Sequence, residues 1–340
     1  MDRYVILGEI LGTGTNGTVG KAMEIVTGNI FAIKKLKRSF SADEECLNIP
    51  EVRCMRELVH PNIVSLHEVI MESNTLYLVL ECMDCDLTQL MRLRGHPFSE
   101  QEVRNLFFQL FKGLAYMHEQ GYCHRDLKPN NLLVCGDTIK IADFGLARNL
   151  LLQSGQPLRS YVVTRSYRAP ELLLGSTDYD FAIDIWAMGV IMAQLLAGCN
   201  LFRGSRKVNQ IYKICSVIGC PNSQTWLHGL ALAASLNYNF PKEFRFVDAT
   251  KQLSSLIPSV SAEAIDLIKL MLSWDPNSRP TARKALQHPF FIPCHITNNN
   301  PIPPPVLQSA YQNPIEKHSE VQEQNARPNN NGEYIPFNRS

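Results

Sequence analysis

Short runs of alternating apolar and polar residues dominate the first eighty or so positions. Four of them read as strands, with sequences YVILGEIL, TVGKAMEIV, NIFAIKKL and TLYLVLE. Residues 27–29 supply a turn between the second and third runs, and residues 43–59 form the one helical candidate in this region. The pattern predicts a small antiparallel sheet interrupted by a single helix.

The period changes to about 3.6 residues from Ser99 onward. Ser99 and Glu102 have the spacing of a capping box, and Gly121 follows the last periodic residue. The apolar face of this helix comprises Val103, Leu106, Phe107, Leu110, Leu114 and Met117. Further helices are predicted over residues 182–197, 208–218, 261–272 and 281–287.

A β-rich part is therefore followed by an α-rich part, which predicts an α+β fold with two lobes. We expect an N-terminal lobe over about residues 4–83 and a C-terminal lobe over about residues 84–291, joined near residues 81–86. A cleft between two lobes is a common place for a small-molecule site. Beyond residue 291 the composition shifts to Asn, Pro and Gln, and we expect residues 298–340 to be disordered.

Composition narrows the class of protein. The 340 residues are 45% hydrophobic and 19% charged, with a net charge of +1, which argues against a strong field for nucleic acid or membranes. The most apolar run, residues 181–198, contains Asp184 and Gln194 and is too short for a span, so it predicts a buried central helix. The N-terminus lacks the long apolar core of a signal peptide.

The ten cysteines are scattered without ligand-like pairing, which favours reduced thiols in a cytoplasmic or nuclear protein. Cys82 and Cys85 form a lone C-x-x-C. Without a second pair, a connecting segment is the better interpretation than a zinc site.

The sequence LGTGTNGTV, residues 11–19, places Gly12, Gly14 and Gly17 between two predicted strands. Glycines let a backbone approach phosphate oxygens closely and offer its N–H groups. A dinucleotide-binding motif would require a helix after the glycines, whereas a strand follows here. A plain β-turn is the alternative.

Lys34, in FAIKKLK, lies on the next predicted strand, from which an ammonium group could reach phosphates beneath the glycine loop. Such a lysine requires a carboxylate to hold it. Glu51, on the helical candidate, is the first choice. By residue type Glu44, Glu45 and Glu57 compete with it, and a solvated helix face is the alternative for each.

Two runs further along bring the remaining chemistry. HRDLKPNN offers Asp126 as an acceptor for a hydroxyl proton, Lys128 to stabilise phosphate charge and Asn131 as an oxygen ligand. In the sequence DFG, Asp143 is a carboxylate of the kind that Mg²⁺ prefers. In this order, these groups predict a phosphoryl-transfer site.

Taken together, these motifs resemble the eukaryotic protein kinases from about Tyr4 to Phe291. The resemblance adds APE at residues 169–171 and implies that Glu171 pairs with Arg279 of WDPNSRP. It implies ATP and Mg²⁺ as cofactors, with Asp126, Lys128, Lys34 and Glu51 catalytic, and Asn131 and Asp143 on the metal. The implied nucleotide contacts are Leu11, Gly12, Thr13, Gly14, Thr15, Asn16, Gly17, Thr18, Val19, Lys34, Leu80, Glu81, Met83 and Asp86.

YRAPELLLG and DIWAMGVIMAQLL resemble the branch with the cyclin-dependent and MAP kinases. MDRY, IYKICSVIG and SWDPNSRPTARKALQHPFF are most similar to the male-germ-cell-associated kinase group, including the plant cyclin-dependent kinases F. This resemblance implies phosphorylation of Ser or Thr before Pro, with Arg168 shaping the site for the residue after the acceptor.

The activation segment, GQPLRSYVVTRSYRAPE, departs from the Thr-x-Tyr of relatives because Arg159 replaces the threonine. Tyr161 remains a candidate for phosphorylation by an upstream kinase, with Ser160 less favoured. Its phosphate would pair with Arg125 or Arg168 and order the loop. The alternative is that Tyr161 only packs.

Pro50, directly before Glu51, is a second departure. Proline breaks a helix interior but is welcome as the first helical residue, so the helix is expected to begin or kink there. Either outcome puts the pairing of Lys34 with Glu51 in doubt. Ser166 and Asn130, which replace a Trp and a Glu of relatives, remove neither a metal ligand nor the base.

An active kinase accounts for every motif, and a nucleotide-binding pseudokinase or scaffold is the competing class. Nucleic-acid binding through KKLKR, residues 34–38, is disfavoured because no other part of the chain extends that run. The helix NIPEVRCMREL differs from the helix of cyclin-binding kinases, so we expect a monomer without a cyclin.

Overall fold

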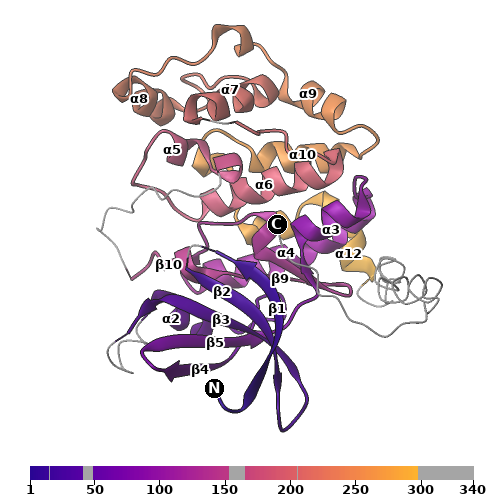
Figure 1. Cartoon of the computed structure of the whole chain (residues 1–340). Coiled ribbons are helices and arrows are strands. Elements are labelled where there is room, and N and C mark those ends of the chain that lie inside the picture. The colour runs from indigo at the N-terminus through magenta and orange to yellow at the C-terminus, as the bar shows by residue number, and fades with distance from the viewer. Residues whose placement is uncertain (15, 41–48, 153–164, 205, 298–340) are drawn as a thin grey trace, which may run out of the picture. The chain divides into compact units, whose positions relative to one another are not determined.

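The computed structural model describes residues 1–14, 16–40, 49–152, 165–204 and 206–297. Its N-terminal part is an antiparallel sheet with strand order β1-β2-β3-β5-β4 (Figure 1). The strands are β1 Tyr4–Thr13, β2 Gly17–Glu24, β3 Ile30–Ser39, β4 Leu66–Glu72 and β5 Thr75–Glu81. Four of the five were predicted, whereas β4 was not.

Among the described residues of this lobe, Pro50–Glu57 form the one helix, α2, and it buries Val52, Cys54 and Met55. It is shorter than the predicted 43–59. Pro50 is its first residue, where a missing N–H costs nothing, and Leu58 ends it in an extended conformation. The earlier part of the predicted helix, residues 41–48, falls outside the described residues.

The C-terminal part is mainly helical, so the predicted bilobal α+β fold is confirmed (Figure 1). Its helices are α3 Leu87–Arg94, α4 Glu100–Glu119, α5 Pro170–Leu173, α6 Ala182–Ala197, α7 Lys207–Ile218, α8 Leu227–Ser235, α9 Ala249–Leu256, α10 Ala262–Met271, α11 Ala282–Leu286 and α12 Ile292–Thr297. Helix α4 begins with the predicted capping box of Ser99 and Glu102.

Helix α6 has the predicted bounds and lies in the interior, where Trp186, Met188 and Ile191 are fully buried. Burial in the protein interior therefore accounts for the apolar run of residues 181–198. Among the described residues, no helix combines the length and apolar character that crossing a membrane requires.

Five short strands flank the segments that contain the HRDLKPNN and DFG motifs. Strands β6 Cys85–Asp86, β8 Leu132–Cys135 and β9 Thr138–Ile141 form one small sheet, and β7 Tyr122–Cys123 pairs with β10 Arg148–Asn149. The 3₁₀ helices η1 Pro129–Asn131, η2 Phe144–Leu146 and η3 Arg165–Tyr167 follow these strands or precede α5. Both HRDLKPNN and DFG lie in the chain between β7 and β10, and the pairing of these two strands holds the ends of that segment together.

Candidate active site

The first cluster forms around Lys34 in the middle of the sheet. Lys34 lies opposite Val19 of β2 and Leu78 of β5. Its Nζ donates to Oε1 of Glu51 at 2.5 Å and to Oδ1 of Asp143 at 2.8 Å. The structure therefore brings together a strand lysine, a helix carboxylate and the DFG aspartate from three distant parts of the sequence.

Pro50 does not disturb this cluster. As the first residue of α2 it starts the helix, and Glu51 in the first turn faces Lys34 with only 7% of its side chain exposed. The pairing of Lys34 with Glu51 that Pro50 put in doubt is therefore present in the structure.

The charges in this cluster support one another. Burial alone would lower the pKa of Lys34, but the carboxylates of Glu51 and Asp143 outweigh it and raise that pKa above its ordinary value. Desolvation would raise the pKa of Asp143, and the nearby ammonium of Lys34 instead lowers it. Both groups are therefore charged at neutral pH.

The second cluster lies in the loop that contains HRDLKPNN, the candidate catalytic loop. Oδ2 of Asp126 accepts hydrogen bonds from Nζ of Lys128 at 2.7 Å and from Nδ2 of Asn131 at 3.1 Å. Nδ2 of Asn131 also donates to the backbone oxygen of Asp126 at 2.9 Å. Because the amide nitrogen is committed to Asp126, Oδ1 of Asn131 is the atom suited to a metal ion.

Asp184 holds this loop in place, a role that sequence reasoning missed. Its buried carboxylate on α6 accepts from the backbone N–H groups of His124 at 2.8 Å and Arg125 at 2.9 Å, and it contacts Nε2 of His118 at 3.0 Å. Burial opposes ionisation, but His118 and the other donors lower the pKa of Asp184. An aspartate inside an otherwise apolar helical run was the available signal.

Two residues at the site have left-handed backbones. Arg125 has φ 71° and Asp143 has φ 62°, a conformation that non-glycine residues adopt at a cost. In Arg125 the backbone N–H is held by Asp184, and in Asp143 the side chain is held by Lys34. The surrounding contacts thus maintain a strained backbone at the two turns that carry Asp126 and Asp143.

The glycine-rich loop is the turn between β1 and β2, where the N–H of Gly14 donates to the oxygen of Gly17 at 2.9 Å. A Cβ on Gly17 would lie 2.4 Å from the backbone oxygen of Lys35, so only glycine fits there. At Gly12 no atom lies within 4 Å of such a Cβ, which leaves open space beside the loop. Thr15 lies outside the described residues.

The predicted adenine contacts lie at the end of β5 and the following segment. Leu80 is on β5 opposite Ala32, and Met83 is buried. The Glu81 carboxylate accepts from the Ser65 N–H at 2.6 Å and from Nζ of Lys140 at 2.6 Å. The remaining predicted contacts are placed on β1 and β2, namely Leu11, Thr13, Thr18 and Val19, with Asn16 in the turn between them.

Asp86 has a structural task that was not predicted. Its Oδ1 accepts from the N–H of Gln89 at 2.9 Å in the capping box of α3, and Oδ2 lies 3.4 Å from Nδ2 of Asn130. Both carboxylate oxygens already have protein partners, so contact with a ribose would add to the capping role.

Within the described residues, no cluster of His, Cys, Asp and Glu suits a metal around Cys82 and Cys85.

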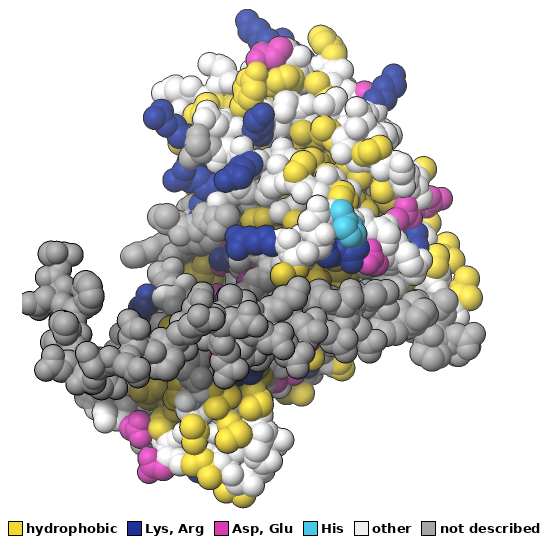
Figure 2. Space-filling model, turned by 45° about the vertical axis from the view of Figure 1, so that its right-hand side comes forward, with side chains coloured by type: hydrophobic (Ala, Val, Ile, Leu, Met, Phe, Trp, Pro, Cys, Tyr) yellow, Lys and Arg dark blue, Asp and Glu magenta, His cyan; other side chains and the backbone are white. Residues whose placement is uncertain are grey.

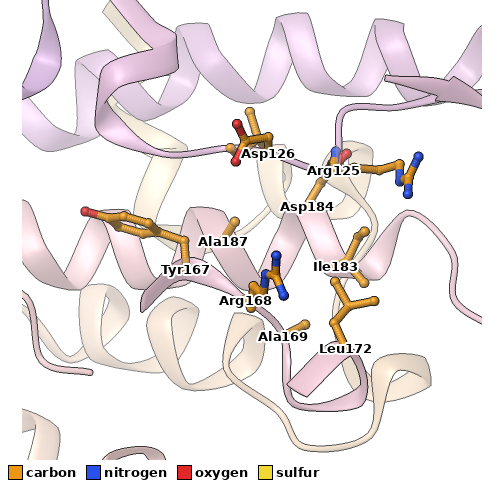
Figure 3. A pocket seen from close by; sticks show the side chains of 10 residues that line it. Arg125, Asp126, Tyr167, Arg168, Ala169, Leu172, Ile183, Asp184 and Ala187 are labelled. Carbon is orange, nitrogen blue, oxygen red and sulfur yellow. Dashed lines mark hydrogen bonds between the residues drawn. The ribbon is translucent and has the colours of Figure 1, made fainter. Parts of the chain in front are cut away.

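A small pocket adjoins Asp126 (Figure 3). Arg168 lines it, and the Asp126 carboxylate and the Arg168 guanidinium lie on opposite sides of it (Figure 3). Its apolar wall consists of Leu127, Ala169, Leu172, Ile183 and Ala187. Arg125, one of the two arginines predicted to pair with a phosphate on Tyr161, donates to the oxygen of Leu146 at 3.2 Å and stacks over Tyr179. Tyr161 itself lies outside the described residues, so this predicted pairing stays a prediction.

Glu171 and Arg279 form the ion pair that the motifs implied. The two side chains are joined by hydrogen bonds of 2.7 and 2.8 Å, with exposed fractions of 3% and 0%. Glu171 belongs to α5, which provides Leu172 to the pocket wall.

Glu57, a rival for the pairing with Lys34, has another partner. Its Oε2 accepts from the hydroxyl of Tyr122 at 2.7 Å, and its Oε1 accepts from Nε of Arg53 at 2.9 Å. The Tyr122 hydrogen bond lowers the pKa of Glu57. Tyr122 lies on β7 immediately before the catalytic loop, so this bond ties the end of α2 to that loop.

Replacing Tyr122 with Phe should weaken the docking of α2 by about 1 kcal/mol, because the hydroxyl is lost while the ring still fills its space. We expect kcat/KM for phosphate transfer to fall roughly threefold to tenfold if α2 docking sets the Lys34 to Glu51 pair. Tyr77→Phe, on β5, is the matched control. Equal activity of the two variants in a peptide phosphorylation assay would show that Tyr122 has no positioning role.

The comparisons with known proteins agree with this geometry. The protein kinase domain model matches residues 5–291. Cyclin-dependent kinase F-4 of Oryza sativa subsp. japonica is 49% identical over 310 residues, which are 91% of this chain and 65% of that protein. Serine/threonine-protein kinase MAK of Mus musculus is 47% identical over 294 residues, covering 86% of this chain and 46% of that protein.

Serine/threonine-protein kinase ICK of Mus musculus is 45% identical over 292 residues, again 86% of this chain and 45% of that protein. The chain thus spans less than two thirds of the length of these relatives. The matched region contains every residue of the two clusters. The chain therefore belongs to the protein kinase family, in the group of the plant cyclin-dependent kinases F and the MAK and ICK kinases.

Proposed function

We propose that this chain is an ATP-dependent serine/threonine protein kinase that transfers the γ-phosphate to protein hydroxyl groups. One observation carries the proposal: Nζ of Lys34 pairs with Glu51 of α2, the ion pair that orients a phosphate-binding lysine, and it lies 2.8 Å from Oδ1 of Asp143. The names of the relatives, which are serine/threonine-protein kinases, support the choice of hydroxyl substrate.

The residues present fit a nucleotide and a hard divalent cation. The side chain of Asp143 is 43% exposed, and the N–H of its neighbour Ala142 donates to the backbone oxygen of Asn131 at 2.9 Å. Asp143 and Asn131 both offer oxygen atoms of the kind that Mg²⁺ prefers. The backbone at Gly12 has open space on the side where a Cβ would lie, so a ligand can approach the loop there. We propose that Asn131 and Asp143 would hold Mg²⁺, and that the cation would neutralise charge on the phosphates when bound.

The residues of the chain then have distinct tasks. Lys34, oriented by Glu51, would hold the α and β phosphates. Asp126 would orient the acceptor hydroxyl and accept its proton, and Lys128, already 2.7 Å from Asp126, would offset negative charge on the transferred group. Such catalysis depends on positioning and on charge stabilisation.

We propose in addition that the residue after the acceptor is proline. The pocket beside Asp126 is small and has an apolar wall, which suits a compact ring. Proline has no backbone N–H, so its burial there leaves no donor without a partner.

The direct test is transfer of labelled phosphate from ATP with Mg²⁺ to synthetic peptides. We expect labelling of Ser-Pro and Thr-Pro peptides, weaker labelling of a Ser-Ala peptide and none of a Tyr-Pro peptide. No transfer to any peptide, with Tyr161 either unmodified or phosphorylated, would refute the kinase proposal. Equal labelling of Ser-Pro and Ser-Ala would refute only the preference for proline.

Binding of ATP with Mg²⁺ should raise the melting temperature. At a ligand concentration of about 100 times Kd the gain is about 2.7 kcal/mol. Asp143→Asn should remove most of the part that depends on Mg²⁺, and Asp137→Asn in the β8–β9 turn is the control. A full Mg²⁺-dependent shift in the Asp143 variant would exclude this metal site.

The chain is further proposed to act as a monomer without a cyclin, once Tyr161 has been phosphorylated by an upstream kinase. In support, its own residues dock α2: Tyr122 holds Glu57, and Lys34 holds Glu51. Activity of the purified chain, measured together with its mass in solution, tests this directly, and dependence on an added cyclin would refute it.

A further inference from the structure

A basic surface lies next to the pocket, and apart from Arg168 its residues have no task in the mechanism above. We define it by Arg165, Arg168, Arg203, Arg206 and Lys207. Three of these five residues lie in the short run RGSRK, residues 203–207. The sequence contains no Asp or Glu between Asp184 and Glu243. Figure 2 shows Lys and Arg side chains gathered on the helical lobe.

Gln210 joins the two halves of this surface. This fully buried residue of α7 donates from Nε2 to the backbone oxygen of Ser166 at 3.5 Å. Its Oε1 accepts from the N–H of Gly204 at 3.0 Å, and its own N–H donates to the oxygen of Arg206 at 2.8 Å. The turn with Arg203 and Arg206 is thereby fixed against η3, which begins at Arg165.

The surface continues directly into the pocket. Arg168 lines the pocket beside Asp126 (Figure 3). Burial and the positive charge of Arg165 lower the pKa of Arg168, and Asp126 opposes that change. The N–H of Arg168 also donates to the backbone oxygen of Arg165 at 3.1 Å, so the two arginines belong to one turn, and an anion near this turn would interact favourably with both charges.

The basic side chains of the turn are exposed to solvent. Arg203, Arg206 and Lys207 are all exposed, and within the part of the chain that the structure describes none of them forms an ion pair. Three neighbouring cations without a carboxylate destabilise one another, and an anionic ligand would offset this cost.

We propose that this basic surface binds an anionic side chain, a carboxylate or a phosphate, located two to five residues after the phosphorylated Ser or Thr of the substrate. The inference rests on the proposed function, because it takes the acceptor hydroxyl to lie at Asp126 and the next residue to fill the pocket. The substrate chain leaving the pocket then passes Arg165 and reaches the turn at Arg203.

A protein segment fits this surface better than nucleic acid does. The cations form a small patch beside a pocket with an apolar wall, while the whole chain has a net charge of only +1. Nucleic-acid binding relies on many phosphate contacts spread along a backbone. A few negative charges next to a proline require only this local patch.

The test measures kcat/KM on four peptides that share one Ser-Pro core and differ at positions +2 to +4. These positions hold three alanines, three glutamates, three lysines, or one phosphoserine between alanines. We expect the glutamate and phosphoserine peptides to exceed the alanine peptide roughly fivefold to twentyfold at low salt, and the lysine peptide to fall below it. If the phosphoserine peptide alone exceeds the alanine peptide, the recognised group is a phosphate, whereas an equal gain for the glutamate peptide shows that a carboxylate is sufficient.

The matched variants are the triple change Arg203→Glu, Arg206→Glu and Lys207→Glu, and the single change Lys242→Glu. The triple variant should lose or invert the preference for glutamate over alanine, whereas Lys242→Glu, at an exposed lysine of the same acid-free stretch, should keep it. Glutamate to alanine and phosphoserine to alanine ratios that both lie within about twofold of unity in the unaltered chain would overturn the proposal. An unchanged ratio in the triple variant would overturn it as well.

Binding of the same peptides, labelled with a fluorophore, separates this proposal from the kinase activity. Anisotropy should show tighter binding of the acidic peptide than of the lysine peptide, with a difference that shrinks as salt is raised. If no peptide is phosphorylated but this difference exists and disappears in the triple variant, the kinase proposal fails and the anion surface stands. Equal binding of the acidic and lysine peptides refutes the surface.

Discussion

Asp126→Asn should lower kcat for peptide phosphorylation by roughly 10²- to 10⁴-fold, the usual contribution of a positioned general base. Asparagine has nearly the same shape, and its oxygen can still accept the hydrogen bond that Lys128 donates to Asp126 at 2.7 Å. What it loses is the ability to take a proton. The change therefore removes the chemical role and keeps the architecture of the loop.

Two measurements place this loss in the chemical step. The first is the melting temperature with ATP and Mg²⁺, which should rise as much in the variant as in the unaltered chain. The second is the activity of Asp137→Asn, the same change at an exposed turn between β8 and β9, which should stay near normal. If Asp126→Asn retained more than a tenth of the activity, Asp126 would not be the base.

The periodic elements could be predicted from the sequence because burial dictates their pattern. Helix α6 has the predicted bounds 182–197, since nearly every position in it faces the interior. Of the two edge strands of the sheet, β1 was predicted and β4 was missed. The side chains of β4 are mostly half-buried, so the sequence LHEVIME shows no clean alternation.

The site shows a similar division. Short motifs identified Lys34, Asp126, Asn131 and Asp143, because each belongs to a local pattern. Glu51 was the first choice for the partner of Lys34, but the reason why Glu57 does not take that place came from the structure. It depends on which turn of α2 faces the sheet and on Tyr122 reaching the other end of the helix.

The pocket could not be predicted from the sequence. Its lining comes from the catalytic loop, the segment around η3, and helices α5 and α6, which are separate in the sequence. Only the fold brings these segments together, so the apolar wall produces no local pattern in the sequence.

The second large effect concerns stability. Replacing Arg279 with Met should lower the free energy of unfolding by about 3 to 5 kcal/mol, the usual cost of leaving one member of a buried ion pair without its partner. The guanidinium has five N–H groups, and all find acceptors: two on Glu171 and one each on Ser273, Ala182 and Trp274. Methionine would fill part of the volume and leave the Glu171 carboxylate buried alone.

Arg283→Met is the matched control, because Arg283 also pairs with a glutamate, Glu119, but its side chain is 70% exposed. Surface pairs contribute little, so this change should cost less than about 1 kcal/mol. Urea unfolding of both variants gives the comparison. A loss at Arg279 no larger than that at Arg283 would show that the buried pair does not stabilise the fold.

The same pair links stability to the substrate site. Glu171 lies in α5, and its neighbours Ala169 and Leu172 form part of the pocket wall beside Asp126. An unpaired carboxylate would pull this segment toward solvent and open the wall. Arg279→Met should therefore also reduce the preference for Ser-Pro over Ser-Ala peptides. In the double variant Arg279→Met with Glu171→Gln, the buried charge is gone, so part of the lost stability should return. If the double variant regains both stability and this preference, the ion pair acts by holding the pocket wall in place. If it regains stability alone, the ion pair itself is needed to shape the pocket.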